Sequence, residues 1–258
     1  QTIGPVRRRL IRRLLSHYLN RADLVCVREE FSREFVLDVL GVPQDKVVRT
    51  TDLALEGIKP PDREAGVQLM SEIGINGHFI GVTIVDWAFP SSFNPEEDKR
   101  TYILKMAELF RSLHSKTGLD IVVFNQVSSD LNCANEIASL TGDFITVDHR
   151  DCSTRDMLNM ISLSQLFIGS RFHSCVFALL AVVPTISISY TYKSTGIMND
   201  LQLSDSVFDI VDFDTQALLN RAIEILNTRS QECIRVLTGL DFIQFPKFRE
   251  VLQTSRDH

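Results

Sequence analysis

Three residues suited to binding an anion and moving a proton follow two apolar runs of this chain. Arg171 and His173 lie in "IGSRFHS", between the apolar run 163–167 and an apolar stretch typical of a helix. Lys193 lies in "TYKSTG", directly after the run "TISISY". Charge is costly between buried elements unless it is paired or used. These residues are therefore the first candidates for a functional site.

The expected topology brings the three residues to one edge of a sheet. Parallel strands present their carboxyl ends to a shared crevice, and a right-handed crossover sets consecutive strands side by side. Helices starting near residues 172 and 194 add free N–H groups there. We predict a site for a multiply charged anion beside a titratable imidazole, with Ser170 also contacting the ligand. Alternatively, Arg171 pairs with an acid and His173 is a half-buried packing residue.

A regular alternation of strands and helices must position these residues. Apolar runs without polar alternation mark strands buried on both faces, which is typical of a doubly wound parallel sheet. We expect strands at 78–85, 119–126, 143–148, 165–170, 184–190 and 205–211, and helices at 96–116, 130–141, 155–164, 172–182 and 214–237.

The first part of the chain predicts a smaller α/β segment. It contains β-rich runs at 23–29 and 46–55, with a helix at 30–41 between them. Two short strands cannot close a sheet alone, so we expect the end of a Rossmann-like half whose front is missing. A Pro- and Gly-containing linker is predicted at 57–66. The expected domains are 1–60, 61–238 carrying the site, and a helical tail at 239–258.

Composition narrows the class of protein further. The chain has 258 residues, 44% of them hydrophobic, and no apolar run near the roughly 20 residues that cross a bilayer. Five cysteines without a CxxC pair favour a reducing compartment, the cytoplasm, with Cys26, Cys175 and Cys233 as buried thiols. No His, Cys, Asp or Glu group has metal-ligand spacing, and we expect neither metal nor cofactor.

The charge is distributed unevenly along the chain. Residues 1–21 contain six arginines and no acid, whereas the rest holds all 33 acidic residues. This pattern argues against a general nucleic-acid binder and indicates a local anionic partner. The amphipathic helix expected over 6–21 either packs on a sheet with its arginines solvated, or contacts an anionic membrane or a diphosphate-linked substrate.

Several motifs together resemble one enzyme family. The stretch "ISLSQLFIGSRFHSCVFALLAVVPTISISYTYKSTGIM" is similar to the signature of the polysaccharide pyruvyl transferase family, as are "QTIGP", "ADLVCVREEFSREFVLDVLGV" and "TTDLAL". The resemblance runs from residue 1 to about 230. Val182 and Gln202 stand where the family usually has glycine, and Leu53 replaces a usual proline.

The resemblance implies two Rossmann-like halves with a glycosyltransferase-B-like (GT-B-like) architecture and a phosphoenolpyruvate-dependent transferase. Such an enzyme forms a pyruvate ketal across two hydroxyls of a sugar in polysaccharide or glycoconjugate biosynthesis. Arg171, and by resemblance Arg28, would bind the donor through two hydrogen bonds each. His173 would protonate the methylene carbon, since its ordinary pKa is about 6.5. Lys193 would stabilise the departing phosphate.

Weaker candidates complete the predicted site. Asp52 follows a strand of the first half, and Arg28 either binds substrate or is a surface residue. Trp87 and Phe89 in "VDWAFPSSFNP" either stack on a sugar ring or pack on their own domain. The acceptor's form stays open among lipid-linked, nucleotide-linked and polymeric sugars. Because phosphoenolpyruvate is a cytoplasmic metabolite, we expect a cytoplasmic enzyme, with the inner membrane face reached through residues 6–21.

Two other functions fit the same residues. A nucleotide-sugar-dependent glycosyltransferase would share the two-domain architecture, because fold does not fix function. A non-catalytic sugar- or phosphate-binding module would use the same cations. The first would need an acid placed for the ribose and diphosphate, and no well-placed Glu follows the Arg-x-His motif.

Overall fold

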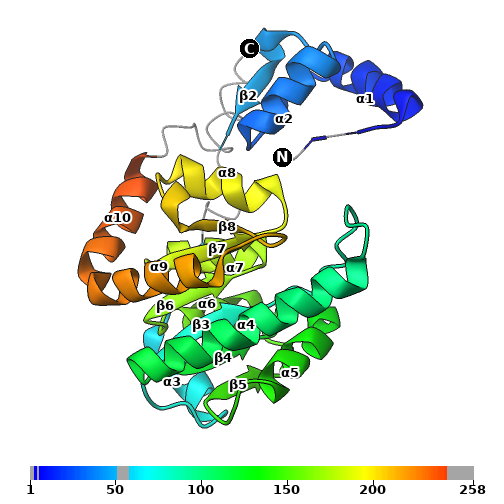
Figure 1. Ribbon diagram of the computed structural model, residues 1–258. Helices are drawn as coiled ribbons and strands as arrows, with labels where there is room; N and C mark the ends of the chain where they lie inside the picture. The colour runs from blue at the N-terminus through cyan, green and yellow to red at the C-terminus, as the bar shows by residue number, and fades with distance from the viewer. Residues whose placement is uncertain (1–2, 5, 51–57, 243–258) are drawn as a thin grey trace. The chain divides into compact units, whose positions relative to one another are not determined.

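The computed structural model describes residues 3–4, 6–50 and 58–242 (Figure 1). The chain divides into two compact units, one formed by residues 1–58 with 241–258 and the other by residues 59–240. Most of the tail expected at 239–258 lies outside the described residues. In the described part of the chain, no helix combines the length and apolarity needed to cross a bilayer.

The larger unit contains a six-stranded, fully parallel sheet with the strand order β5-β4-β3-β6-β7-β8. Its strands are β3 (Phe79–Thr83), β4 (Asp120–Phe124), β5 (Ile145–Asp148), β6 (Leu166–Gly169), β7 (Thr185–Ser189) and β8 (Val207–Asp209). Its helices are α3 (Arg63–Ser71), α4 (Pro95–Thr117), α5 (Leu131–Ser139), α6 (Thr154–Ile161), α7 (Phe172–Leu180), α8 (Tyr192–Asp200), α9 (Thr215–Asn227) and α10 (Arg229–Phe242).

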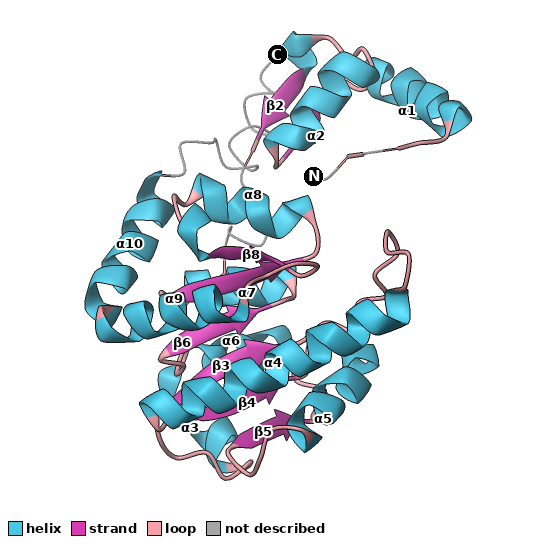
Figure 2. Ribbon diagram, in the orientation of Figure 1, coloured by secondary structure: helices cyan, strands magenta, loops and turns pink. Residues whose placement is uncertain are grey.

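Helices cover both faces of this sheet (Figure 2). On one face α4 packs between α5 and α9, and on the other α6 packs between α3 and α7. All residues of β3, β6 and β7 are buried, which explains their continuous apolar sequences. The predicted doubly wound parallel sheet is confirmed. The strand order reverses between β3 and β6, so this pair marks the switch point at which such folds bind ligands.

One predicted helix and the predicted linker differ from the structure. The single helix expected at 214–237 is two helices, because Thr228 leaves the helical conformation and its hydroxyl donates to the carbonyl of Glu224 at 2.8 Å. The linker expected at 57–66 ends earlier, because α3 begins at Arg63. Asp62 caps this helix by accepting from the backbone N–H of Ala65.

The smaller unit contains a two-stranded parallel sheet. Its described elements are α1 (Arg9–Arg21), β1 (Val25–Val27), α2 (Glu30–Glu34), a π-helix (Phe35–Val39), a 3-10 helix (Gln44–Lys46) and β2 (Val47–Arg49). The helix expected at 30–41 is therefore α2 continued by the π-helix. Leu15 and Leu19 of α1 pack against the core of this unit, and Ser16 donates to the carbonyl of Leu40 at 2.6 Å.

Two non-glycine residues adopt the left-handed conformation where the resembling family usually has glycine. Val182 has a φ of 57° after α7, and Gln202 has a φ of 59° after α8. A β-branched residue is unfavourable there because its side chain crowds the backbone. Each position follows a helix that contains a predicted site residue, His173 in α7 and Lys193 in α8. The left-handed conformation at these two turns lowers the stability of the fold.

The cysteines are all free thiols. Cys175 is buried as predicted, whereas Cys26 and Cys233 are only half-buried. Burial raises the pKa of Cys175 to about 12, so this thiol stays protonated and acts as a small apolar residue. It packs so close to Gly169 that a side chain at position 169 would meet its sulfur. The strand end before the Arg-x-His motif therefore requires glycine.

Candidate functional site

The Arg-x-His motif lies at the switch point of the larger unit. Arg171 directly precedes α7, and the backbone N–H of Ser170 extends the ladder by donating to the carbonyl of Thr83 at 3.0 Å. The hydroxyl of Ser174 lies 2.7 Å from that of Thr83 and donates to the carbonyl of Arg171 at 2.7 Å. These buried contacts fix the first turn of α7 to β3.

Arg171 forms a two-point ion pair with Asp130. Its Nε donates to Oδ2 at 2.7 Å and its Nη2 donates to Oδ1 at 2.6 Å. The side chains of Arg171 and Asp130 are only 23% and 7% exposed. Partial burial lowers the pKa of Arg171, but its hydrogen bond and attraction to Asp130 outweigh this effect and raise that pKa above its ordinary value. Arg171 therefore pairs with an acid, as in the alternative interpretation of the sequence.

Asp130 was not among the residues predicted from the sequence. It ends a short 3-10 helix, Ser128–Asp130, which follows β4, and it also accepts from the backbone N–H of Asp86 at 2.9 Å. One carboxylate thus holds Arg171 and the loop after β3. The only sequence signal for this residue is an acid placed just beyond a buried strand.

The guanidinium of Arg171 keeps donors for a ligand. A guanidinium has five N–H donors. Two bind Asp130, and Nη1 donates to the hydroxyl of Tyr190 at 3.4 Å, with the guanidinium carbon 6.0 Å from the Tyr190 ring centre. Among the described residues, none accepts from the two remaining N–H groups. This arrangement fits a fixed cation that receives an anion on its outer side.

His173 and Lys193 occupy equivalent positions. Each is the second residue of a helix that follows its strand, α7 after β6 and α8 after β7. These strands pair in parallel, with Ile168 opposite Ile186, so both helices begin at the same edge of the sheet. His173 is exposed, with its ring centre 5.1 Å from that of Phe172, and Lys193 is half-buried. The edge thus carries a cation, an imidazole and two helix N-termini.

Ser170 lies beneath this edge. It is 1% exposed, and its hydroxyl is 3.5 Å from that of Tyr102 in the core. Burial also raises the pKa of Tyr102. The structure therefore places Ser170, predicted to contact a ligand, in the packed layer under the Arg-x-His motif.

Arg28 belongs to the smaller unit. It follows β1, and its Nε lies 2.5 Å from a carboxylate oxygen of Glu29. Its side chain is 11% exposed. The other oxygen of Glu29 accepts from Ser32 at 2.9 Å, and Ser32 accepts from the backbone N–H of Ile3 at 3.1 Å. Asp52 lies outside the described residues.

Trp87 is half-buried in the loop after β3. Its ring centre is 4.6 Å from that of Tyr190, which follows β7. Together they line a pocket of about 210 Å³ at the carboxyl edge of the sheet. Trp87 is thus linked to Arg171 through Tyr190. Within the described residues, no group of three or more His, Cys, Asp or Glu side chains could hold a metal ion.

Solved structures show which fold class the two units belong to. The chain aligns with a glycosyltransferase from Rickettsia africae over 99% of its own length and 68% of that chain, at a TM-score of 0.60 and 12% identity. It aligns with Anabaena Alr3699/HepE, solved with UDP and glucose, over 95% of its own length and 66% of that chain, at a TM-score of 0.58 and 13% identity. The fold is that of the GT-B glycosyltransferases, with Rossmann-like halves.

The sequence comparison identifies the family. The model of the polysaccharide pyruvyl transferase family matches residues 1–192, and the chain belongs to this family. A curated relative, the amylovoran biosynthesis protein AmsJ of Erwinia amylovora, is 20% identical over 222 residues, 81% of this chain. The chain spans about half of that relative's length, 52%.

Proposed function

We propose that the protein transfers the pyruvyl group of phosphoenolpyruvate onto two hydroxyls of a sugar in polysaccharide biosynthesis. The observation that carries this proposal is the guanidinium of Arg171, which Asp130 orients and which has N–H groups that are not bound to Asp130. His173 and Lys193 lie in the first turns of α7 and α8 at the same edge of the sheet. Phosphoenolpyruvate has a carboxylate and a phosphate on one carbon, and a fork of fixed N–H donors suits such an anion. The family supports a transferase of this kind.

The reaction can be written with these residues in defined roles. His173 donates a proton to the methylene carbon, which becomes a methyl group and leaves an oxocarbenium-like centre. One sugar hydroxyl adds to that centre, phosphate departs, and the second hydroxyl closes the ketal. One hydroxyl proton restores His173 and the other leaves with phosphate. Arg171 holds the donor, and Lys193 stabilises the negative charge on the leaving phosphate.

Other components of the proposal rest on the family resemblance. We propose Arg28 and Asp52 as further donor-binding residues because they match motifs of the family. The resemblance includes no cofactor. Phosphoenolpyruvate is a cytoplasmic metabolite, so we place the reaction in the cytoplasm. The acceptor is a sugar whose carrier, lipid, nucleotide or polymer, the proposal leaves open.

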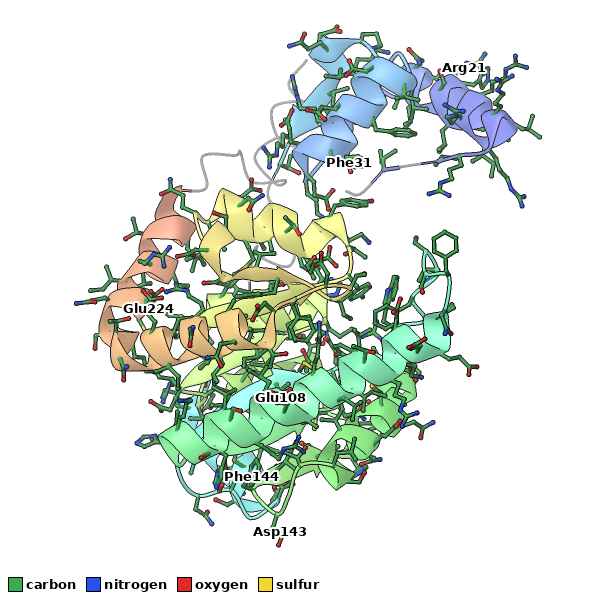
Figure 3. The ribbon with its side chains drawn as sticks, in the orientation of Figure 1. Arg21, Phe31, Glu108, Asp143, Phe144 and Glu224 are labelled. Carbon is green, nitrogen blue, oxygen red and sulfur yellow. The ribbon has the colours of Figure 1, made fainter. Side chains whose placement is uncertain are left out.

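We also propose that α1 contacts an anionic membrane. Leu10, Leu14 and Tyr18 on this helix are 71%, 50% and 67% exposed, and arginines accompany them (Figure 3, where Arg21 is labelled). Exposed apolar side chains beside arginines suit the interface of an anionic bilayer. The full chain should co-sediment with phosphatidylglycerol vesicles but not with phosphatidylcholine vesicles, and less at high salt. Equal binding to both, or none, would contradict this contact.

Ligand-dependent thermal stabilisation tests the donor assignment. A ligand of the folded state raises stability by RT ln(1 + [L]/Kd), so phosphoenolpyruvate, UDP and UDP-glucose can be compared directly. We expect stabilisation by phosphoenolpyruvate in the wild type and in Arg150→Ala, a control outside the site, but not in Arg171→Ala. His173→Asn should keep this stabilisation and lose ketal formation. Stabilisation by the UDP compounds alone would favour the nucleotide-sugar glycosyltransferase.

A further inference from the structure

The larger unit has a pocket lined by aromatic side chains that is separate from the residues assigned to the donor. It opens between the loop after β3, the start of α4 and the ends of β7 and β8. Trp87 and Tyr190 form one wall with their rings inclined by 43°. Ser92, Asp98 and Asp209 are also among the residues that line the pocket. The lining therefore combines aromatic faces with hydrogen-bond acceptors.

This combination suits a sugar ring. A pyranose has an apolar face of C–H groups, which packs on aromatic rings, and a rim of hydroxyls. Carboxylates bind only as acceptors when ionised and form strong hydrogen bonds with such hydroxyls. Pockets for drug-sized ligands have about 300–1,000 Å³. The volume here, about 210 Å³, suits a single ring.

The loop that presents Trp87 is held in a strained conformation. Phe89 has a φ of 45°, in the left-handed region, yet its side chain is 2% exposed and its ring centre is 6.2 Å from that of Tyr102. Asp86 pairs with Lys99 of α4 at 2.6 Å. Strain of this kind persists only where the surroundings fix it, and it gathers at binding sites. The loop is thus anchored on both sides of Trp87.

The pocket shares a wall with the anion site. Tyr190 packs against Trp87 and accepts a hydrogen bond from Arg171 at 3.4 Å. We propose that this pocket holds one neutral pyranose ring, with Trp87 and Tyr190 against its C–H face and Asp98 and Asp209 on its hydroxyls. The inference rests on the proposed function insofar as this sugar is the acceptor of the pyruvyl group.

The chain supplies its own reporter for this pocket. Trp87 is the only tryptophan, so its fluorescence reports the pocket alone. Titration of the full chain with the methyl pyranosides of galactose, glucose and mannose should give a saturable change for at least one of them. Asp98→Asn should weaken the binding of that sugar about tenfold, because the charged acceptor of a hydrogen bond becomes neutral.

A matched control lies on the same loop. Phe93 is fully exposed and does not line the pocket, so Phe93→Ala should leave the titration unchanged. Circular dichroism of each variant verifies folding. Absence of a saturable signal with all three pyranosides, or equal affinity in Asp98→Asn and the wild type, would overturn the sugar site.

Calorimetry with phosphoenolpyruvate separates this inference from the proposed function. If phosphoenolpyruvate binds and no pyranoside does, the pocket proposal fails and the donor assignment stands. If a pyranoside binds and phosphoenolpyruvate does not, the sugar site stands and the proposed function fails. Arg171→Ala should abolish phosphoenolpyruvate binding while the fluorescence titration with the pyranoside persists.

Discussion

Two arginine–aspartate pairs lie at the carboxyl edge of the same sheet. Arg171 and Asp130 meet at the switch point, and Arg150 and Asp148 meet at the end of the edge strand β5. Both pairs are forked, with Nε and Nη2 of Arg150 each 2.8 Å from Asp148. Arg150 is 30% exposed and Arg171 23%. As isolated ion pairs they are alike.

The pairs differ in what the other donors contact. Arg150 also donates to the carbonyl of Leu69 at 3.1 Å, to Glu72 at 2.8 Å and to the sulfur of Met160 at 3.4 Å. All five of its N–H groups are thus used, and it joins α3 and α6 to β5. In the described part of the chain, Arg171 has one further partner, the hydroxyl of Tyr190. A fully used arginine stabilises the fold, whereas one with donors left over can bind a ligand.

Replacing the acids should have the largest effect on stability. Breaking a buried ion pair costs about 3–5 kcal/mol, and partial exposure of each arginine reduces this to about 2 kcal/mol. We expect Asp130→Asn and Asp148→Asn to lower the free energy of unfolding by similar amounts in urea. An unchanged free energy of unfolding in Asp130→Asn would show that this carboxylate does not hold Arg171 in place.

Replacing each arginine by lysine should affect the affinity for phosphoenolpyruvate differently in the two pairs. Lysine keeps the charge but lacks the planar fork, so it cannot hold the acid and a second anion together. Arg171→Lys should weaken the binding of phosphoenolpyruvate about tenfold, or by about 1.4 kcal/mol, in calorimetric titration. Arg150→Lys should leave this affinity unchanged. Equal losses in both variants would contradict the distinction drawn from donor use.

A substitution that touches neither pair sharpens the comparison. Val182 holds a left-handed conformation, so Val182→Gly relieves a strain of about 1–2 kcal/mol, partly offset by greater freedom of the unfolded chain. We expect a net stabilisation of about 0.5–1 kcal/mol by urea denaturation, with unchanged phosphoenolpyruvate affinity. A loss of stability would mean that packing of the valine outweighs its backbone strain.

Removing the remaining partner of Arg171 should have the smallest effect. Tyr190→Phe deletes a hydroxyl that accepts a long hydrogen bond of 3.4 Å and keeps the ring against Trp87. We expect less than about 0.5 kcal/mol of lost stability and a change below about twofold in donor affinity. A tenfold loss would show that this hydroxyl contacts the donor itself.

The sequence predicted the fold because its strands carry a strong local signal. Continuous apolar runs marked the buried parallel strands, and the right-handed crossover rule placed β6 beside β7, as the structure confirms. The break at Thr228 was missed, because the apolar pattern continues through it and only the hydroxyl–carbonyl bond reveals the end of α9. Local periodicity identifies elements better than their ends.

The arrangement of the candidate site was predicted only in part. Arg171, His173 and Lys193 are brought to one edge because each follows a strand or begins a helix there. Asp130 precedes Arg171 by 41 residues, and no spacing rule pairs residues on different strands. The anchoring of Phe89 is likewise a tertiary effect: its ring enters the core against the preference of its backbone. Such partners depend on packing, which periodicity does not encode.

Calorimetric titration of phosphoenolpyruvate into the wild type, Arg171→Ala and Arg150→Ala tests the central claim most directly. Both variants lose an aspartate-paired arginine at the same sheet edge, so a loss of stability alone would also weaken binding in Arg150→Ala, whose arginine has more partners. We predict wild-type affinity in Arg150→Ala and no detectable binding in Arg171→Ala. Undiminished binding in Arg171→Ala, or its loss in both variants, would contradict a donor site at the switch point.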